Sequence, residues 1–553
     1  MSGFELSNEQ REAAMSDQGH VMIIAPPGCG KTEVLAHRAA HQISLLEKNR
    51  RVLALTFTNR SRSNLEERLR SVLGYEQMRR NIVVRNFHGY ATQIVLAHGR
   101  TIGMDMDSLL LPKTTTVRRA LDSLNAGNAG YEAERLLSEV KRSPRSDEEV
   151  LRVLELESPS RSRDLALQVE CARQEANQLH YDDLLRHAQR LLLIPAIMRL
   201  YQAHFGAVLV DEFQDLSMQQ LDISRLSCTA RQTYAGDPLQ GIFSWAGAAP
   251  LEVESELRKI CGEPIRLHES YRSSPQVLET VNSVSEKVDP ESTLVAARPE
   301  QWKGGGCSAV LVFQDREEEA ETLFGLACAI FARDPGASIG IICRASWRRK
   351  DIDKTFAGEA GFDVRRWDLA IENPQVVSLI QSTIAALPRG TSVEDARLAV
   401  LDVLDPSDVE TREHVDDAFD TLVGSGEATA RAAVRSIRVS DPKQTIGPGV
   451  HLLNAHTGKG QQFDWVFVVG LEEGHLPSRR NSQGEKLEEE QRVLLVMLSR
   501  ARHGLIATRI QTAEGMYGPY AASASRWWNT LEASCNSVEQ VEAHLRLGMQ
   551  DTE

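Results

Sequence analysis

The feature that most constrains this 553-residue chain is the segment His20–Thr32, which reads HVMIIAPPGCGKT. Its apolar run at 21–24 predicts a buried strand, a glycine-containing turn follows, and residues 33–40 predict a helix. Strand, turn and helix in this order let backbone N–H groups wrap phosphates at a helix N-terminus. We expect Lys31 to reach the β- and γ-phosphates and the Thr32 hydroxyl to hold Mg²⁺. Ala25 stands where the strict pattern has glycine, so a solvated turn remains the alternative for this segment alone.

A second acidic motif weakens that alternative. Residues 207–215 read AVLVDEFQD, an apolar strand that ends in two carboxylates. This arrangement suits the end of a parallel strand beside a phosphate loop. Asp211 is then expected to support Mg²⁺, and Glu212 to polarise the attacking water as a general base. A lone Asp-Glu pair is more often a solvated turn, but the strand before it and the loop upstream favour catalysis.

Length and composition limit the class of protein. The chain is too long for one core, and roughly three to four domains are expected. We find no apolar run long enough for a bilayer and no signal-peptide pattern, and the eight cysteines form no CxxC pair. We therefore expect a cytoplasmic, reduced protein with no membrane partner. The net charge of −14 argues mildly against a nucleic-acid partner but says little about a local cleft.

Further short motifs follow one another along the chain. They are LSNEQ at 6–10, LTFTN at 55–59, NFHG at 86–89, HYDDLL at 180–185, GDPLQGIFSWAGA at 236–248, LHESYRS at 267–273, NAHTGKGQQF at 454–463, GLEEGHLP at 470–477 and the segment 488–502, which contains SRA at 499–501. Each is weak alone. Together and in this order, they make the chain resemble the UvrD/Rep/PcrA-like superfamily 1A DNA helicases from about residue 6 to about residue 531.

The resemblance implies an α/β architecture of two RecA-like P-loop NTPase domains with parallel sheets, each interrupted by a helical insertion. The helical periodicity of Val117, Leu121 and Leu124 agrees with the first insertion. The expected boundaries are domain 1A at 1–89 and 181–264, insertion 1B at 90–180, domain 2A at 265–373 and 446–545, a shortened acidic insertion 2B at 374–445, and a tail at 546–553.

The resemblance also implies a site for ATP and Mg²⁺, with Gln10 reading the adenine edge and Tyr271 stacking on the base. The implied catalytic residues are Lys31, Asp211, Glu212, Gln240 and two arginine fingers, Arg272 and Arg500. The implied nucleotide-binding residues are Gln10, Pro27, Gly28, Cys29, Gly30, Lys31, Thr32, Glu33, Arg38, Tyr271, Gly460 and Gln462, and the implied metal ligands are Thr32 and Asp211. Gln462 stands where the family usually has a glutamate, and Pro26-Pro27 replace the usual Gly-Ala.

A motor on single-stranded DNA needs surfaces that stack on any base and groups that hold phosphates. The expected DNA-binding residues are Phe57, Thr58, Asn59, Phe87, His88, Phe243, Trp245 and His456. Core packing remains the alternative for Phe57 and Phe87. Ala246 replaces the arginine that usually follows the tryptophan in this family. This puts in doubt one link between nucleotide state and DNA grip.

The two insertions differ in charge. The first contains Lys141-Arg-Ser-Pro-Arg145, which either touches duplex backbone or is a solvated helix end. The second is acidic, with eleven Asp/Glu against three Lys/Arg from Arg389 to Glu427. We expect it not to grip the duplex. It is either a solvated helical face or a docking site for a protein partner.

Two functions follow from these features. The first is a helicase that moves 3′ to 5′ on single-stranded DNA and unwinds tailed duplexes. The second is a DNA-responsive ATPase subunit that regulates a partner protein such as a nuclease or a repair or defence factor. The compact form resembles helicase subunits of Gabija-type anti-phage systems. A P-loop kinase would leave the motifs at 55–59, 236–248, 454–463 and 488–502 unexplained.

Overall fold

The computed structural model describes residues 5–112, 116–244, 247–357, 361–367, 370–371, 374–404, 409–423, 427–435, 438–439, 446–515 and 518–536. The chain divides into two compact units. The first unit is Met1–Ala25 with Gly30–Leu267, and the second unit is Pro26–Cys29 with His268–Glu553.

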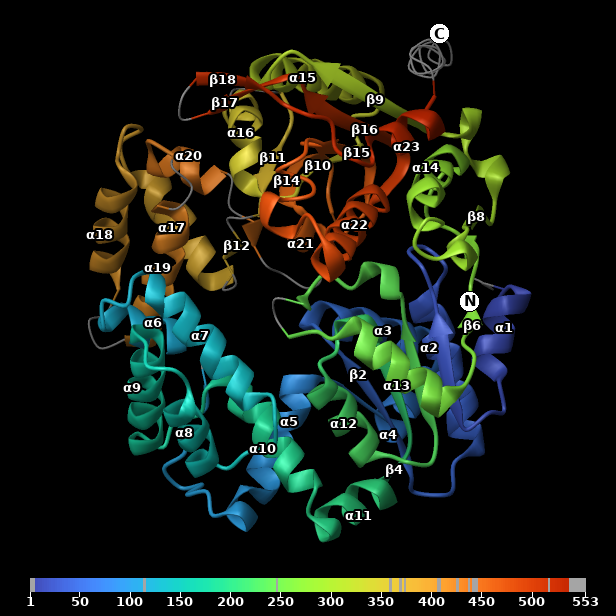
Figure 1. Cartoon of the computed structure of the whole chain (residues 1–553), viewed down its shortest axis with the longest axis vertical. Helices are drawn as coiled ribbons and strands as arrows, with labels where there is room; N and C mark the ends of the chain where they lie inside the picture. Colours follow the sequence, from blue (N-terminus) through green and yellow to red (C-terminus); the bar gives the residue numbers. More distant parts are fainter. Residues whose placement is uncertain are drawn as a thin grey trace. The chain divides into compact units, whose positions relative to one another are not determined.

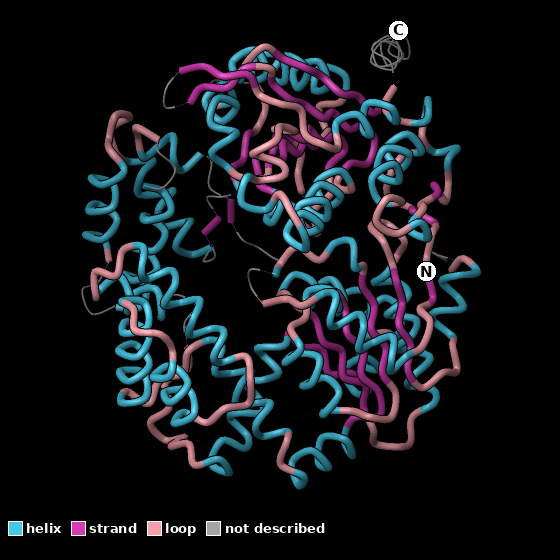
Figure 2. The backbone as a smooth tube through the Cα atoms, viewed as in Figure 1, coloured by secondary structure: helices cyan, strands magenta, loops and turns pink. Residues whose placement is uncertain are grey.

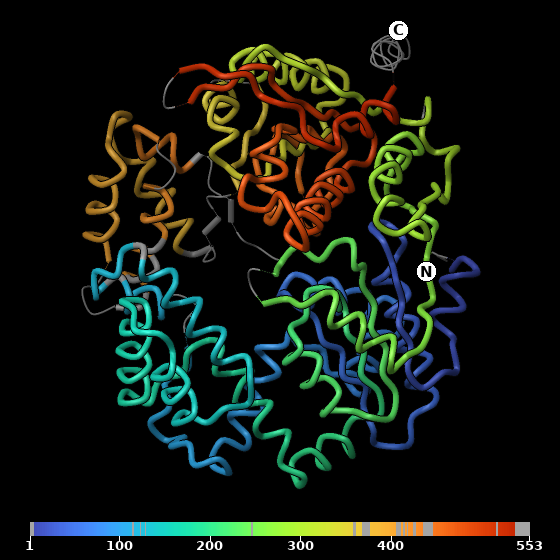
Figure 3. The backbone as a smooth tube through the Cα atoms, in the orientation of Figure 1, coloured from blue at the N-terminus to red at the C-terminus, as the bar shows by residue number. Residues whose placement is uncertain are grey.

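The first unit is built on a six-stranded sheet of order β3-β2-β4-β5-β1-β6, in which every pairing is parallel (Figure 1). The strands are β1 (His20–Ile24), β2 (Arg51–Thr56), β3 (Ile82–Asn86), β4 (Phe205–Asp211), β5 (Gln232–Gly236) and β6 (Ile265–Arg266). All of β4 is buried, as expected of a central parallel strand. Early and later segments of the chain share this sheet, and Figure 3 shows the blue and green segments of this unit side by side.

Helices connect these strands, and the carboxyl ends of the strands meet at one edge of the sheet. The helices are α1 (Asn8–Met15), α2 (Lys31–Leu45), α3 (Asn59–Leu73), α4 (Tyr75–Asn81), α5 (Phe87–His98), α10 (Tyr181–Leu192), α11 (Pro195–His204), α12 (Met218–Ser227) and α13 (Pro250–Cys261). The motifs at 25–32, 57–59, 86–89, 211–215 and 236–240 follow β1 to β5 and therefore lie at this edge.

Among its described residues, the first insertion contains the helices α6 (Thr116–Ser123), α7 (Asn128–Lys141), α8 (Asp147–Leu156) and α9 (Arg161–Glu175). They bury a hydrophobic core of their own that includes Leu121, with Val117 and Leu124 packed against it. The helical periodicity expected for this segment is therefore confirmed. The exact domain boundaries stay predictions.

The second unit contains another six-stranded parallel sheet, of order β11-β14-β10-β15-β16-β9 (Figure 2). Its strands are β9 (Cys307–Phe313), β10 (Ser338–Cys343), β11 (Val364–Arg366), β14 (Gly449–Asn454), β15 (Phe463–Val469) and β16 (Ala501–Ile510). The helices around it are α14 (Pro275–Ser285), α15 (Arg316–Arg333), α16 (Lys350–Phe356), α21 (Ala455–Gly458), α22 (Gly484–Leu498) and α23 (Trp528–Ser534). The predicted α/β class with two parallel RecA-like sheets is confirmed.

Shorter elements complete the second unit. β7 (Glu269–Ser270) pairs with β8 (Val295–Ala296), β12 (Ala370–Ile371) with β13 (Arg438–Val439), and β17 (Thr512–Gly515) with β18 (Gly518–Ala521). The second insertion contains α17 (Pro374–Ala386), α18 (Val393–Val403), α19 (Val409–Val423) and α20 (Ala430–Arg435), which share a core of their own. Within the described ranges, none of the helices has both the length and the apolar character needed to cross a membrane.

Candidate nucleotide and nucleic-acid site

The loop after β1 has the backbone of a phosphate-binding turn. Gly28 and Gly30 have φ angles of 89° and 78°, and Gly30 is the N-cap of α2. Glycine is favoured there because other residues rarely adopt this left-handed region. A β-carbon on Gly30 would lie 2.7 Å from Nε2 of Gln10. The glycines therefore let the loop backbone come close to a phosphate, and Gly30 leaves room for the Gln10 amide to pack against the loop.

Gln10 is fixed in place by the first helix. Ser7 and Gln10 form a capping box on α1, in which the Ser7 N–H donates to Oε1 of Gln10 over 3.1 Å. The side chain is only 1% exposed. Because its oxygen is bonded at the cap, its amide nitrogen faces Gly30. The first motif of the sequence and the phosphate loop are therefore brought together.

Lys31 brings residues far apart in sequence together. Its Nζ lies 3.1 Å from Oδ1 of Asp211 and also pairs with Oε2 of Glu212. Burial alone would lower the pKa of Lys31, but the two carboxylates outweigh it and raise that pKa above its ordinary value. Burial raises the pKa of Asp211, and Lys31 opposes this shift. The lysine is cationic at any physiological pH and lies beside two carboxylates.

Glu212 has an unusual backbone conformation for a residue with a side chain. Its φ of 60° is left-handed, which is uncommon outside glycine and marks a local constraint. Its carboxylate accepts a 2.6 Å hydrogen bond from Nε2 of Gln214. Oε1 of Gln214 accepts in turn from the Asp237 N–H at 2.9 Å. Glu212 is therefore held both by its backbone and by a fully buried amide.

The same chain of hydrogen bonds reaches the end of β5. Oδ2 of Asp237 accepts from Nε2 of Gln240 over 2.8 Å, and burial raises the pKa of Asp237. A β-carbon on Gly236 would lie 2.3 Å from Oε1 of Gln214, so only glycine leaves room for that amide. Sequence reasoning missed Gln214 and Asp237 as site residues. The signal available was their position inside the motifs at 211–215 and 236–240.

These residues fit a nucleoside triphosphate with Mg²⁺. A glycine cradle, a lysine and a helix N-terminus suit phosphates, while a threonine hydroxyl and a strand-end carboxylate suit Mg²⁺. In the described part of the chain, no three or more His, Cys, Asp or Glu side chains group as a metal cage. Mg²⁺ needs no such cage, since it usually takes one or two carboxylates together with substrate phosphates. Thr32 and Asp211 would be its protein ligands.

Two of the predicted nucleotide-binding residues are engaged elsewhere in the first unit. The Glu33 carboxylate pairs with His37 at 3.0 Å and with Arg68. Arg38 is fully buried and donates to the carbonyls of Ser16 and Gln18, and burial lowers its pKa to about 10. The structure does not bring their charged groups to Lys31.

Tyr271 and Arg272 lie in the second unit with residues 26–29. The Tyr271 N–H donates to the Gly28 carbonyl over 2.9 Å, and the Ser270 hydroxyl donates to that of Pro27 over 3.4 Å. The phenol of Tyr271 donates to Glu269, with the guanidinium of Arg298 5.9 Å from the centre of its ring. A β-carbon on Gly28 would lie 2.6 Å from Cβ of Arg272. Cys29 is buried.

Arg500 is buried within the second unit, with 1% of its surface exposed. Its guanidinium donates to the Val496 carbonyl at 2.8 Å and to the Gln461 carbonyl at 3.4 Å. Gly460, with φ 80°, and the exposed Gln462 flank Gln461. The motifs at 454–463 and 499–501 are thus joined inside one unit. His456 is half-buried in α21 nearby in sequence.

Several predicted DNA-binding residues gather at the edge of the first sheet. The rings of Phe57 and Phe243 stack with centroids 5.8 Å apart, and both are partly exposed. Thr58 caps α3 through the Ser61 N–H, and Asn86 caps α5 while donating to Oδ1 of Asn59 over 2.8 Å. Two neighbouring helix N-termini therefore open beside an aromatic pair. Helix N-termini favour phosphate groups.

Phe87 corrects one expectation. It is fully buried in the core of the first unit with Leu55 and Tyr90. Its ring has no exposed face on which a base could stack. The prediction that Phe87 stacks on DNA is therefore wrong, and the core-packing alternative applies. Trp245 and its neighbour Ala246 lie outside the described residues.

Tyr181 is an aromatic residue outside the predicted DNA-binding set. It begins α10, and its ring stacks on His88 with centroids 3.9 Å apart. Tyr181 is 38% exposed, and burial lowers the pKa of His88 to about 4. A neutral imidazole under an exposed phenol ring gives a second aromatic surface near the N-terminus of α5. The motif at 180–185 was the signal that could have found it.

One residue in the basic segment of the first insertion, Lys141, differs from expectation. Lys141 is 1% exposed and pairs with Glu170 at 2.7 Å and with Asp183 at 3.0 Å. It is therefore neither a duplex contact nor a solvated helix end. Only Arg142 in this segment has an exposed side chain with charge.

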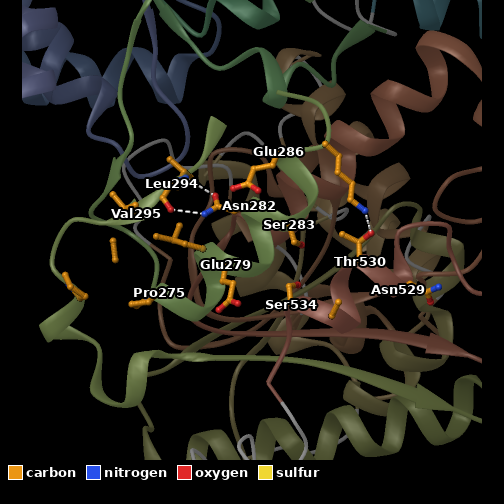
Figure 4. A pocket seen from close by; sticks show the side chains of 15 residues that line it. Pro275, Glu279, Asn282, Ser283, Glu286, Leu294, Val295, Asn529, Thr530 and Ser534 are labelled. Carbon is orange, nitrogen blue, oxygen red and sulfur yellow. Dashed lines mark hydrogen bonds between the residues drawn. The ribbon is translucent and has the colours of Figure 1, made fainter. Parts of the chain in front are cut away.

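A cavity of about 930 Å³ lies in the second unit (Figure 4). α14 and α23 line it, together with Glu286, Lys287, residues 294–296 and Pro299. Two sides of the cavity are joined by Asn282, whose amide donates to the Leu294 carbonyl at 2.8 Å and accepts from the Leu294 N–H at 2.9 Å. None of its lining residues is a predicted site residue.

Comparison with known proteins agrees with the motif order. Residues 6–259 match the family model of the UvrD/REP helicase N-terminal domain, and residues 431–512 match that of the UvrD-like helicase C-terminal domain. DNA helicase II of Salmonella typhimurium is 25% identical over 645 aligned positions, which cover 97% of this chain and 88% of the relative. UvrD2 of Mycobacterium bovis is 27% identical, and the alignment covers 95% of this chain and 81% of the relative. PcrA of Leuconostoc citreum is 28% identical, and the alignment covers 50% of this chain and 39% of the relative.

Proposed function

Because this chain belongs to the UvrD/REP helicase family, we propose that it is an ATP-dependent DNA helicase that moves 3′ to 5′ on single-stranded DNA. The polarity and the unwinding step rest on the family. The observation that carries the proposal is the group formed by Lys31, Asp211 and Glu212 at the carboxyl edge of the first sheet.

The residues of this group divide the work of hydrolysis. ATP with Mg²⁺ supplies the phosphoryl group and an electrophilic metal, which Thr32 and Asp211 would hold. Lys31 carries the positive charge for the phosphates. Glu212 takes a proton from the attacking water, and Gln214 fixes the orientation of its carboxylate through the 2.6 Å hydrogen bond.

The remaining nucleotide contacts are assigned from the motif order. We assign Gln10 and Tyr271 to the base, and Arg272 and Arg500 to the γ-phosphate. An arginine there stabilises charge that develops during transfer and contributes on the order of 10³-fold or more in rate. The burial of Arg500 and its bonds to two backbone carbonyls support a fixed orientation for this side chain.

We assign the strand path to the same sheet edge. Bases would stack on the Phe57–Phe243 pair and on Tyr181, and phosphates would lie at the N-termini of α3 and α5. Stacking contributes about 1–3 kcal/mol per base without regard to sequence. Gln240 and Asp237 lie on the same loop as Phe243. This loop would therefore couple ATP hydrolysis to the grip on the DNA strand.

Strand displacement tests the proposal. A labelled duplex with a 3′ single-stranded tail should be unwound in the presence of ATP, while a duplex with only a 5′ tail should not. Unwinding from the 5′ tail alone would contradict the polarity. ATPase activity that DNA stimulates, with no displacement from either tail, would favour the second function, a regulatory ATPase subunit acting on a partner protein.

A further inference from the structure

The C-terminal end of α7 places one buried and one exposed cation side by side. Lys141 is 1% exposed, whereas the side chain of its neighbour Arg142 is exposed. Within the described parts of the chain, Arg142 forms no ion pair. Arg135, on the same helix, pairs with both Glu132 and Glu139. Arg142 is therefore a cation that the first insertion presents outward.

This end of α7 is anchored firmly to the sheet domain. Nζ of Lys141 lies 3.0 Å from Oδ2 of Asp183 at the start of α10. Nε2 of Gln219 in α12 donates to the Lys141 carbonyl at 3.3 Å, and Arg186 donates to the Arg145 carbonyl at 2.6 Å. Residues 141–145 are thus tied to α10 and α12 on both sides of Arg142. A side chain on such a support has a defined position.

The Arg142 guanidinium rests on Gly247, close to the strand path. A β-carbon on Gly247 would lie 2.6 Å from Cζ of Arg142 and 2.7 Å from its Nε, so only glycine lets the guanidinium approach this closely. Gly247 belongs to the loop that carries Phe243, whose ring stacks on Phe57. The same loop is pinned by the Ala249 N–H, which donates to the Leu216 carbonyl at 2.9 Å. An insertion residue thereby reaches the aromatic edge.

We propose that Arg142 is a phosphate-binding residue of the single-strand path, supplied by the insertion to the loop that carries Phe243. A guanidinium offers several N–H donors in a plane that matches a phosphodiester, and it binds there through charge-assisted hydrogen bonds. The stacked aromatic pair supplies the base surface, and Arg142 supplies the charge. The inference rests on the proposed function, because it deepens the assignment of the same path.

Nucleic acid is favoured over an acidic protein surface by the setting of Arg142. The loop that it touches also carries a partly exposed ring, and two capped helix N-termini open at the same sheet edge. Rings and phosphate-favouring groups together are what a single strand requires, whereas an acidic protein surface would need only charge.

The test compares Arg142→Ala, Arg142→Lys and the control Arg135→Ala in the full-length protein. Arg135→Ala removes the same charge from the same helix. The first measurement is the anisotropy of a fluorescent oligothymidylate of about 16 nucleotides, titrated without nucleotide at several salt concentrations. The second is ATPase activity with and without that oligonucleotide.

We expect Arg142→Ala to weaken binding about tenfold at low salt, because a hydrogen bond to a charged group is lost. The slope of log affinity against log salt should fall by about 0.7, the value for one phosphate contact on a single strand. Arg142→Lys should recover part of the affinity, whereas Arg135→Ala should change neither the affinity nor the salt slope and should leave basal ATPase activity constant. A merely structural role would leave the salt slope unchanged.

Two outcomes separate this inference from the proposed function. An unchanged salt slope and affinity in Arg142→Ala would overturn the phosphate contact, even where DNA stimulates the ATPase. Binding of the oligonucleotide with the predicted slope change, but with no stimulation of ATPase activity, would contradict the motor and leave the contact established. Absence of oligonucleotide binding by the unaltered protein would overturn both.

Discussion

At the scale of single residues, Glu212 shows how the site depends on groups that never touch the substrate. Its left-handed φ of 60° would by itself cost stability. The buried Gln214 amide holds the Glu212 carboxylate through a hydrogen bond. Gln214 also bonds the Asp237 backbone, so one amide joins the ends of β4 and β5. Positioning of the general base is therefore the role we assign to Gln214.

Replacing Gln214 with leucine should lower the maximal ATPase rate by at least about tenfold, because general-base catalysis of about 10²–10⁴ needs an oriented carboxylate. The KM for ATP should change little, since Gln214 faces Glu212 and not the phosphate loop. Steady-state kinetics with and without DNA measure both quantities. A rise in KM at constant maximal rate would show that Gln214 acts on binding instead.

Some residue roles could be predicted from sequence and some could not. Lys31, Asp211 and Glu212 were predictable as one group because strand-end motifs of a parallel sheet must meet at one edge. Phe57 and Phe87 both follow strand ends, yet one is partly exposed and the other is core. The direction of a side chain beside a helix N-terminus depends on packing, which sequence motifs do not record.

At the scale of elements, α10 joins the first insertion to the sheet through buried charges. Asp183, fully buried, pairs with Lys141 and Arg186, and Glu170 pairs with Lys141 and Arg173. Although burial alone would raise the pKa of Asp183, these cations hold it well below its ordinary value. The composition of the segment 141–145 predicted surface charge, because sequence alone does not show the acidic partners brought by α9 and α10.

Replacing Asp183 with asparagine should destabilise the protein by about 3–5 kcal/mol, because Lys141 and Arg186 would each lose one of two carboxylate partners and keep only Glu170 and Asp147. Asp182→Asn is the matched control: its carboxylate accepts from Ser138 on the partly exposed side of α10 and should matter by less than about 1 kcal/mol. Urea unfolding followed by circular dichroism compares the two. Equal midpoints would refute a dominant role for the buried network.

The same helix predicts a dependence of stability on pH. Burial lowers the pKa of both His180 and His187 to about 3, with nearby Lys141 and Arg186 adding to the shifts. Below about pH 6.5 these histidines are protonated in the unfolded chain, whose histidine pKa is near 6.5, but they stay neutral in the folded chain. Stability is complete above about pH 6.5 and is lost as the pH falls toward 3.

At pH 5.5 this loss should be about 1.4 kcal/mol per histidine relative to neutral pH. Replacing His187 with asparagine should remove one such contribution, so that the drop in unfolding free energy between pH 7.5 and 5.5 becomes smaller by about that amount. Urea titrations at the two pH values measure it. A drop of unchanged size in the variant would contradict the assignment.

At the scale of the whole molecule, the charge is distributed unevenly. The chain carries a net charge of −14, and its second insertion is strongly acidic. Part of that acidity is balanced internally, because Arg397 pairs with Asp416 at 2.8 Å and with Asp420 at 3.0 Å. The architecture was predictable because the motifs occur along the chain in the order typical of a family with two parallel sheets. The charge pairing within the insertion was not, because it depends on how α18 packs on α19.

Neutralising the acidic insertion should leave DNA binding intact. The combined change of Asp416, Asp417 and Asp420 to asparagine should alter oligonucleotide affinity by less than about twofold, because an acidic surface repels a phosphate backbone and is not expected to contact it. Anisotropy titration at moderate salt measures the affinity, and Arg142→Ala is the positive control. Weaker binding in the triple variant would show that the insertion does contact DNA.

The central claim is that ATP hydrolysis at Lys31, Asp211 and Glu212 is coupled to a single strand. Its most direct test is steady-state ATPase activity with and without single-stranded DNA, for the unaltered protein and for Lys31→Ala and Glu212→Gln. We predict strong stimulation by DNA that both substitutions abolish. Activity that is indifferent to DNA, or that survives both substitutions, would contradict the account.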